Sequence, residues 1–274
     1  MRIAFLPGSF RPDRCGVSHY TAHLVKALNA LGVQCTVITT RAAAEHHGRA
    51  EVIGATQTWG PRMLLSLPVA VRRLDPDILH IQHAAGSFGF RRTVFWLPQA
   101  LRLAGWRGPI VVTLHEYGWW EWKAPLWQAL GPWGERRGLW DREDLGLLVG
   151  ARAVVVTHEG AQRALVSRLP QIAGRLVQVP IGPNIAYTAT DRAAARAALR
   201  ERFGWSAEAE VVSFFGFVHP VKGIETLLRA FVRVLQAHPG ARLVINGGVQ
   251  SLALYGAGAL QYQGKLQALI DELG

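Results

Sequence analysis

Residues 214–235 read FFGFVHPVKGIETLLRAFVRVL and contain the end of a strand, a loop and a helix. The apolar run from Val211 to Phe215 predicts a buried strand, and the apolar residues after the loop recur at helical spacing. That spacing puts five side chains on the inward face of the helix: Ile224, Leu227, Leu228, Phe231 and Leu235. A strand that passes through a short loop into an amphipathic helix is the repeating unit of a parallel α/β sheet.

Lys222 lies at the start of this helix, where free backbone N–H groups and the helix macrodipole already create a positive potential. A lysine in this place either extends into solvent or helps to hold an anion that the helix terminus also binds. Its position between Gly216 and Gly223, directly after a strand, favours the anion. We therefore expect a phosphate group to bind at this loop, with backbone N–H groups near the two glycines as further donors.

Strand-like runs alternate with helical patterns along the rest of the chain. The runs are short, rich in β-branched residues and apolar on both faces, which is typical of a doubly wound parallel sheet. The expected strands are 3–6, 35–39, 77–82, 109–115, 153–157 and 176–181, followed by 211–215 and 241–247.

A polar, alanine-rich stretch divides this series into two parts. We expect an N-terminal Rossmann-like domain at residues 1–185, a linker with a short helix at 186–208, and a second domain that begins at 209 and is partial at 274. The second part contains only two expected strands, whereas an α/β domain commonly has roughly 100 to 150 residues.

The composition narrows the choice of partners and compartment. The chain of 274 residues has 30 Lys and Arg against 19 Asp and Glu, a formal net charge of +11, which favours anionic partners. The arginines are scattered and no nucleic-acid-binding motif is present, so we do not expect nucleic acid as a partner. Cys15 and Cys35 match neither a disulfide framework nor a metal-binding pattern, which indicates a reducing, cytoplasmic compartment and no metal. No apolar run is long enough to span a bilayer.

Parallel sheets bind ligands at the carboxyl ends of their strands, so the residues that follow each strand are candidates for a site. Gly16 ends the loop after the first strand, which is either a phosphate cradle or a plain connection. His80 and His83 lie on one strand but three residues apart, so they face opposite sides, and we expect hydrogen-bonded structural roles for both. His115 and Glu116 follow the next expected strand, where a histidine can bond a substrate hydroxyl or exchange a proton and a carboxylate can orient it.

Residues 117–142 contain six of the ten tryptophans, mixed with lysine and arginine. Amphipathic rings beside cations suit a membrane interface or a large apolar acceptor, for which Trp119, Trp120, Trp122 and Trp127 are the candidate contacts. The alternative is a lid whose tryptophans pack on the first domain.

Several motifs together make the chain resemble the retaining nucleotide-sugar glycosyltransferases of family 4 (group 1), which have the GT-B fold of two Rossmann-like domains. The likeness extends over the whole chain, and the segment that contains Lys222 is its most specific part. The matching segments are CGVSHYTAHLVKALNALGVQCTVIT (15–39), DILHIQH (77–83), VTLHE (112–116), VPIGPN (179–184) and FGFVHPVKGIETLLRAFVRVLQAHPGARLVINGG (215–248).

The resemblance implies roles for particular residues. Lys222 would bind the diphosphate of the donor, Gly16 would lie beneath the same phosphates, and His115 would contact the transferred sugar, with Glu116 beside it. It also implies transfer of a hexose from a nucleoside diphosphate sugar to a hydroxyl of a glycan or lipid-linked acceptor, with retention and without an obligatory metal or other cofactor. Such enzymes act in polysaccharide biosynthesis, in the cytoplasm or on the cytoplasmic face of a membrane.

Three features depart from the family pattern. Phe217 stands where a second phosphate-binding arginine is expected, with His219 as its partial substitute, and Cys15 replaces a glycine of the first loop. The E-x7-E element that holds the ribose and the sugar, and the crossover helix, would fall beyond residue 274. Two alternatives therefore stay open: a non-catalytic lobe that binds an acceptor or a membrane, and a nucleotide-sugar epimerase of the same architecture.

Overall fold

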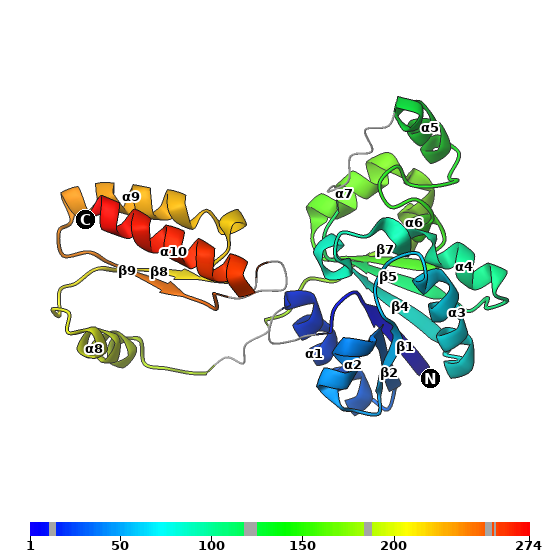
Figure 1. The fold of residues 1–274 in the computed structure, drawn as a ribbon, viewed down its shortest axis with the longest axis horizontal. Helices are drawn as coiled ribbons and strands as arrows, with labels where there is room; N and C mark the ends of the chain where they lie inside the picture. The colour runs from blue at the N-terminus through cyan, green and yellow to red at the C-terminus, as the bar shows by residue number, and fades with distance from the viewer. Residues whose placement is uncertain (11–14, 118–124, 184–187, 250–253, 255) are drawn as a thin grey trace. The chain divides into compact units, whose positions relative to one another are not determined.

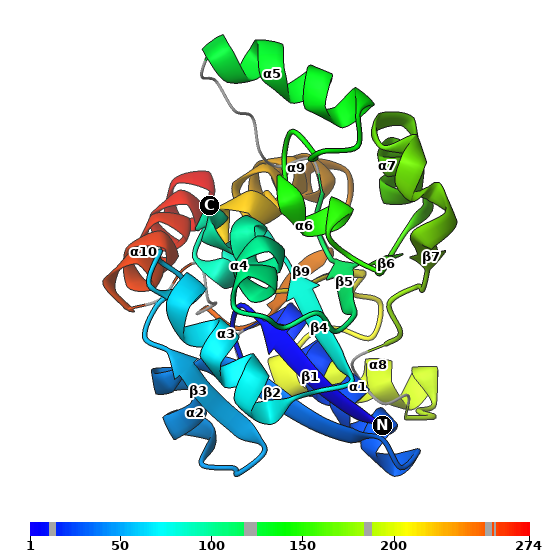
Figure 2. The same ribbon diagram turned by 90° about the vertical axis from the view of Figure 1, so that its right-hand side faces the viewer.

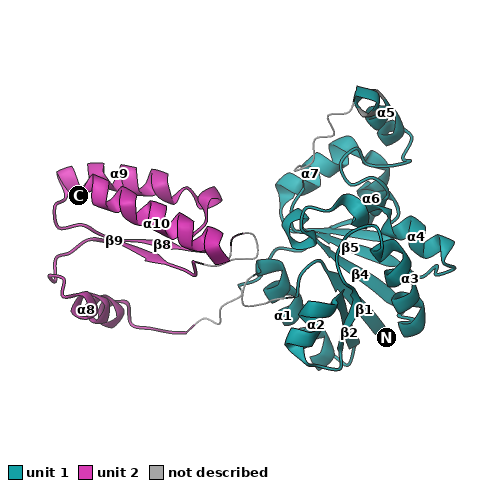
Figure 3. Cartoon of the chain, in the orientation of Figure 1, with its two compact units in different colours: residues 1–184 teal, residues 185–274 magenta. Residues whose placement is uncertain are grey.

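The structure is a computed structural model that describes residues 1–10, 15–117, 125–183, 188–249, 254 and 256–274 (Figure 1). Its contacts divide the chain into two compact units, Met1–Asn184 and Ile185–Gly274 (Figure 3). Each unit contains a parallel sheet and its own hydrophobic core.

A seven-stranded parallel sheet forms the centre of the first unit, with the strand order β3-β2-β1-β4-β5-β6-β7. The order reverses between β1 and β4, which is the doubly wound arrangement that the sequence predicts. Its strands are β1 (Arg2–Pro7), β2 (Gln34–Thr40), β3 (Val52–Thr56), β4 (Ile78–His83), β5 (Ile110–Leu114), β6 (Ala153–Val156) and β7 (Leu176–Gln178).

Helices cover both faces of this sheet (Figure 2). Side chains of β1 alternate between the two cores, because Ile3 and Phe5 point to the face under α1 while Ala4 and Leu6 point to the face under α3 and α4. The helices of the unit are α1 (Gly16–Ala30), α2 (Arg41–His47), α3 (Met63–Leu74), α4 (Leu97–Leu103), α5 (Pro125–Arg136), α6 (Gly146–Val149) and α7 (Glu159–Arg168), with short 3-10 turns η1 (Ala85–Phe88), η2 (Arg92–Trp96) and η3 (Pro170–Arg175).

The second unit is built on a two-stranded parallel sheet. Helices α9 and α10 pack together on it through a small core that contains Ile224, Leu228 and Tyr262. The elements of this unit are α8 (Arg192–Phe203), β8 (Val211–Phe215), η4 (Pro220–Lys222), α9 (Ile224–Ala237), β9 (Arg242–Asn246) and α10 (Gly256–Leu273).

The second unit confirms the helix expected after residue 223 but corrects the burial of the strand before it. Ile224 and Leu228 of α9 are buried, in keeping with the predicted inward face. By contrast, Phe215 of β8 is 76% exposed and Val212 is 40% exposed. A sheet of two strands whose core lies under α9 and α10 leaves the other face of β8 open to solvent.

Four elements of the first unit are absent from the sequence prediction: α2 and β3, and the helices α5 and α6 in a stretch that reads as irregular. Gly54 interrupts the apolar run of β3, and a glycine inside a short apolar run argues against a strand. The structure gives another reason for it: a Cβ at Gly54 would lie 2.7 Å from the Cα of Arg41, so the glycine permits α2 to pack closely. Because β3 is an edge strand, it adds to the sheet without changing the fold class.

Candidate functional site

The carboxyl ends of β1, β4 and β5 lie side by side where the strand order of the first unit reverses. His115 directly follows β5, and its backbone N–H donates to the carbonyl oxygen of His83 at the end of β4 over 2.9 Å. The ring of Tyr20, one turn into α1, meets the ring of His115 edge-on with 4.9 Å between centroids. The start of α1 and His115 are therefore held at the same edge of the sheet.

The imidazole of His115 is oriented by Gln82, a fully buried residue of β4. Its Nε2 lies 2.9 Å from Oε1 of Gln82, so the ring donates through Nε2 and carries its acceptor lone pair on Nδ1. No described residue bonds to Nδ1. Burial lowers the pKa of His115 to about 4, which keeps the ring neutral near pH 7. Such a ring suits acceptance of a hydrogen bond from a substrate hydroxyl.

Glu116 is half-buried next to His115 in the chain, but no hydrogen bond among the described residues joins the two side chains. Burial raises the pKa of the Glu116 carboxyl, and a hydrogen bond from the backbone of Ala85 partly offsets this. In the structure, Gln82 contacts the His115 ring in the way that was expected of Glu116, and the role of Glu116 stays a prediction. Sequence reasoning missed Gln82, although a glutamine inside the apolar run of β4 was a usable signal.

The first turn of α1 offers free backbone donors. The first helical bond runs from the N–H of His19 to the carbonyl of Cys15 over 3.0 Å, which leaves the N–H groups before His19 without a helical acceptor. Ser18 does not cap the helix; its buried hydroxyl donates to the carbonyl of Ser9 over 2.7 Å and ties α1 to the loop after β1. A Cβ at Gly16 would meet nothing within 4 Å, so the space in front of this terminus is open.

In the second unit, the expected phosphate loop lies between β8 and α9. Gly216 and Gly223 both have positive φ angles, +150° and +68°, which favours glycine at each. The side chain of Lys222 is exposed and forms no ion pair with any described residue. Nδ1 of His219 accepts from the N–H of Val221 over 3.2 Å, so the ring directs Nε2 away from this bond.

The start of α9 combines these donors with one carboxylate. The first helical bond of α9 runs from Leu227 to the carbonyl of Gly223 over 2.9 Å, so the N–H groups of Ile224 and Thr226 have no helical acceptor. Those of Lys222 and Gly223 are not available, because they donate to carbonyl groups within the loop. Glu225 lies in the same turn, but its oxygens accept from Tyr262 over 2.7 Å and from Lys265 over 3.3 Å. The negative charge is thereby drawn toward α10, which leaves Lys222 as the charged group nearest the loop.

The predicted tryptophan contacts lie largely outside what the structure describes. Trp119, Trp120 and Trp122 fall outside the described residues, and so does the side chain of Trp127 in α5. Across the described part of the chain, no helix combines the length and apolar character needed to cross a bilayer. The described residues also contain no group of three or more His, Cys, Asp or Glu side chains placed to hold a metal ion.

A second group of titratable residues lies between the end of α5 and α7 and consists of Glu135, Asp141, Glu143 and Asp144 around Arg168. Nη2 of Arg168 lies 3.0 Å from both Glu135 and Asp141, and the guanidinium also pairs with Glu143. Burial raises the pKa of Asp141 to about 7 and that of Asp144 well above its usual value. These contacts join residues 135–144 to α7, which is a structural role.

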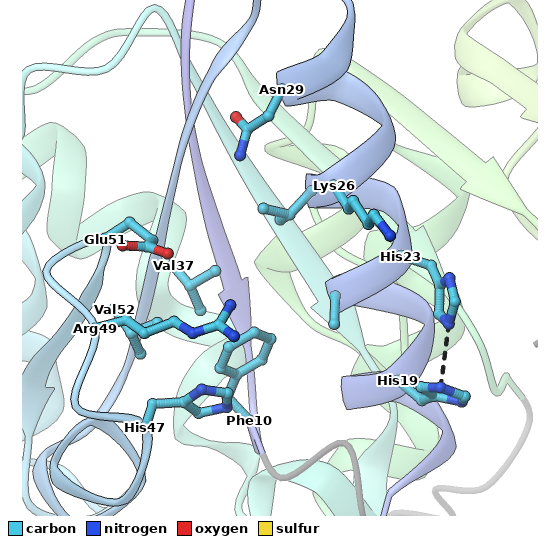
Figure 4. A pocket seen from close by; sticks show the side chains of 12 residues that line it. Phe10, His19, His23, Lys26, Asn29, Val37, His47, Arg49, Glu51 and Val52 are labelled. Atoms are coloured by element: carbon cyan, nitrogen blue, oxygen red, sulfur yellow. Dashed lines mark hydrogen bonds between the residues drawn. The ribbon is translucent and has the colours of Figure 1, made fainter.

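A cavity of about 360 Å³ lies between α1 and the side of α2 and β3 (Figure 4). His19, His23 and Lys26 of α1 line one side, and Nε2 of His19 lies 3.1 Å from Nε2 of His23. The lining extends along α1 from His19, three residues after Gly16, to Asn29, so one end of the cavity lies close to the first turn of the helix.

Comparison with known proteins gives a family and a set of relatives. The family model described as Glycosyltransferase Family 4 matches residues 15–187, which is more than half of the chain. D-inositol 3-phosphate glycosyltransferase of Kineococcus radiotolerans is 26% identical over 86% of this chain and 57% of its own length. The protein of the same name from Mycolicibacterium vanbaalenii is 30% identical over 78% of this chain and 45% of its own length. The chain thus spans about half the length of these curated relatives.

Solved structures show the same fold. A glycosyltransferase of Rickettsia africae covers 99% of this chain and 65% of its own with a TM-score of 0.59 and 12% identity. For the catalytic domain of starch synthase IV of Arabidopsis thaliana, the match covers 99% of this chain and 71% of that chain, with a TM-score of 0.58 and 14% identity. For UDP-GlcNAc 2-epimerase of Neisseria meningitidis, it covers 100% of this chain and 70% of that chain, with a TM-score of 0.54 and 13% identity. At these identities the likeness concerns the GT-B architecture alone.

Proposed function

The chain belongs to Glycosyltransferase Family 4, and from this premise we propose that it contains the acceptor-side domain and part of the donor domain of a retaining hexosyltransferase. The acceptor-side domain is residues 1–185, the linker 186–208 and the partial donor domain 209–274. In the reaction, the bond between the anomeric carbon of a hexose and the diphosphate of a nucleotide breaks, and a bond to an acceptor hydroxyl forms on the same face of the sugar. The hydroxyl proton leaves with the diphosphate.

Charge develops on the diphosphate oxygens as the sugar leaves, so donors fixed in advance at that position accelerate the reaction. We propose that each unit supplies donors of this kind: the N–H groups before His19 at the start of α1 in the first unit, and the side chain of Lys222 before α9 in the second. Gly16 permits the phosphate to approach α1, since nothing occupies the space where its side chain would be. No metal is needed for this charge stabilisation.

The observation that carries the proposal is the hydrogen bond between His115 and Gln82, at the same strand ends that meet the start of α1. It fixes a neutral imidazole with its acceptor nitrogen available, next to backbone donors suited to phosphate. A hexose hydroxyl is the kind of group that can donate to Nδ1 while the attached diphosphate bonds to α1. His115 therefore positions the sugar and does not act as its acid.

The names of the relatives suggest a first acceptor substrate. Those proteins are named D-inositol 3-phosphate glycosyltransferases, so D-inositol 3-phosphate is the first acceptor to assay. Hydroxyls of glycans and of lipid-linked sugars are the other acceptor classes that we propose, in the cytoplasm or on the cytoplasmic face of a membrane.

The donor site is tested by titrating UDP-, GDP- and ADP-glucose into the chain and into Gly16→Ala, Lys222→Ala and the control Lys26→Ala. Loss of one charge-assisted contact should weaken binding of the preferred donor by about ten-fold in Lys222→Ala. Gly16→Ala should fold normally, because its Cβ meets nothing, yet bind the donor more weakly. Equal affinity of all four proteins would remove both residues from the site.

A second candidate function is a non-catalytic lobe that binds an acceptor or a membrane without transferring sugar. Assay of the same mixtures for free nucleotide and for glycosylated acceptor separates the two functions. Release of nucleotide with glycosylated product supports the transferase, and binding without turnover supports the lobe. Interconversion of the sugar epimers without any acceptor would instead support an epimerase.

A further inference from the structure

The outer sides of α3 and α4 form an apolar groove of about 550 Å³ in the first unit. The two helices pack against each other on one face of the sheet (Figure 2). Four large apolar side chains line the groove and face solvent: Leu103 is 90% exposed, Leu65 76%, Val69 61% and Trp96 50%. We refer to these four residues and Arg72 as the α3–α4 face.

These side chains are additional to the ones that attach the helices to the sheet. Met63, Leu67 and Val71 form the buried stripe of α3, and Leu97 and Leu101 that of α4. A surface helix normally has one apolar stripe and a polar opposite face. Here α3 and α4 are apolar on both sides, which indicates that the outer side also meets an apolar partner.

The charged side chains of α3 and α4 are of one sign: Arg72 and Arg73 in α3, and Arg102 in α4. Residues 52–115 contain seven arginines and no lysine, against two acidic residues, Asp75 and Asp77. Both acidic residues are within salt-bridge distance of Arg2, at 3.4 Å and 3.8 Å. The arginines are Arg62, Arg72, Arg73, Arg91, Arg92, Arg102 and Arg107.

This charge pattern selects among the partners that could cover the face. A second copy of the chain would bring like charges together, so it is disfavoured. A nucleic acid would satisfy the arginines but gain little from Leu65, Val69 and Leu103, since its surface is mainly phosphate and sugar. A lipid surface with anionic headgroups offers phosphate to the arginines and hydrocarbon to the leucines, and tryptophan is enriched at that depth.

We propose that the α3–α4 face docks on an anionic lipid surface. Leu65, Val69, Trp96 and Leu103 enter the boundary between headgroups and acyl chains, while Arg72 and its neighbours pair with lipid phosphates. The proposal rests on this surface alone and is independent of the transferase function. It also differs from the tryptophan hypothesis for residues 119–127, because none of those residues belongs to the face.

The test is co-sedimentation of the whole chain with vesicles of phosphatidylglycerol and phosphatidylcholine in equal parts, and with phosphatidylcholine alone. We expect binding to the mixed vesicles only. The double variant Leu65→Glu with Leu103→Glu should bind at least about ten-fold more weakly, since it removes two inserting side chains and adds two charges. Both positions are highly exposed, so the fold should be retained.

A matched control separates insertion from net charge. Leu31→Glu with Leu260→Glu makes the same change at positions that are 79% and 64% exposed elsewhere on the chain, and it should retain most of the binding. Arg72→Gln with Arg73→Gln should weaken binding by roughly ten- to thirty-fold at low salt, at about 1 kcal/mol for each charge.

Four results would overturn the proposal. They are absence of binding to mixed vesicles, equal loss of binding in the two leucine double variants, a dimer in sedimentation velocity that Leu65→Glu with Leu103→Glu abolishes, and binding to RNA or duplex DNA that the same variant weakens. The dimer would assign the face to a second copy, and the last result would assign it to nucleic acid.

Discussion

His80, His83 and His115 are three buried or half-buried imidazoles on adjacent strands of the first unit. Nε2 of His80 lies 2.8 Å from the hydroxyl of Thr113, which fits the hydrogen-bonded role expected for it. The ring of His83 packs on Phe88 instead, and its Nδ1 has no hydrogen-bond partner among the described residues. Their contacts also lie on opposite faces of β4, as expected from their spacing.

These histidines should make the protein less stable in mild acid. Burial lowers each pKa to about 4, aided in His80 and His83 by repulsion from His115, whereas the unfolded value is 6.5. Between these two values the unfolded chain binds more protons, so the free energy of unfolding falls as the pH drops from 6.5 toward 4. Urea denaturation across this range should show a falling midpoint, and the histidines should contribute no slope above pH 7.

Substitution of single histidines shows which residues cause the fall in the free energy of unfolding between pH 6.5 and 4. His83→Leu should remove about a third of the histidine contribution, since three groups share it. His46→Leu, at an exposed position, should leave the slope unchanged. A midpoint that does not vary between pH 6.5 and 4 in the unsubstituted protein would contradict the neutral, buried state of these rings.

Gly247 controls the close approach of the loops after β8 and β9. A Cβ at this position would lie 1.7 Å from the carbonyl oxygen of Gly216, so Gly247→Ala must displace backbone. We expect it to destabilise the second unit by about 2 to 4 kcal/mol, as strong steric conflicts do. Gly240→Ala, where a Cβ meets nothing within 4 Å, should cost little. Thermal denaturation of both variants compares them directly, and equal melting temperatures would contradict the assigned contact.

The sequence locates the candidate site residues better than it locates their partners. His115 follows a recognisable strand, so its place at the sheet edge could be predicted from the chain alone. Gln82 and Tyr20 could not be assigned to it, because they reach His115 through strand register and the packing of α1. Side-chain orientation between residues 33 positions apart is a property of the assembled sheet.

At the scale of the element, Arg168 of α7 holds three carboxylates that would otherwise be buried charges. Arg168→Met should destabilise the first unit by about 3 to 5 kcal/mol, because Glu135, Asp141 and Glu143 lose their shared cation. Arg163→Met on the same helix breaks only an exposed pair with Glu159 and should cost about 0 to 1 kcal/mol. Chemical denaturation measures the free energy of unfolding of both variants. A similar loss in the two would contradict a structural role for the ion pairs between Arg168 and the three carboxylates.

The prediction of helices and strands agrees with the structure where apolar residues recur at a regular spacing. It differs where a packing contact requires a residue that interrupts the spacing. β8 begins and ends at the predicted residues, Val211 and Phe215. By contrast, β3 is not recognisable in the sequence, because Gly54 interrupts its apolar run. The glycine permits the close contact between β3 and Arg41 of α2. The side chains of β8 are also more exposed than its apolar run predicts, because that run does not show how many strands and helices will pack around it.

At the scale of the whole molecule, the two units have separate cores of different size. Residues on both faces of the seven-stranded sheet build the cores of the first unit, whereas Ile224, Leu228, Tyr262, Leu266 and Leu269 are the buried members of the second core. Calorimetry should therefore show two transitions, with the second unit melting at the lower temperature. Gly247→Ala should shift only the lower transition and Arg168→Met only the upper one. A single transition that both substitutions shift would contradict independent units.

The open strands of the second unit have a consequence for the behaviour of the chain in solution. Among the described residues, β8 and β9 bond only to each other, so each has an outer row of backbone N–H and C=O groups, and Phe215 is exposed beside one of them. Such an edge is a template onto which the same strand of another molecule can add. We therefore expect concentrated samples to form fibrous polymers slowly, so that storage time, more than heating, governs their loss.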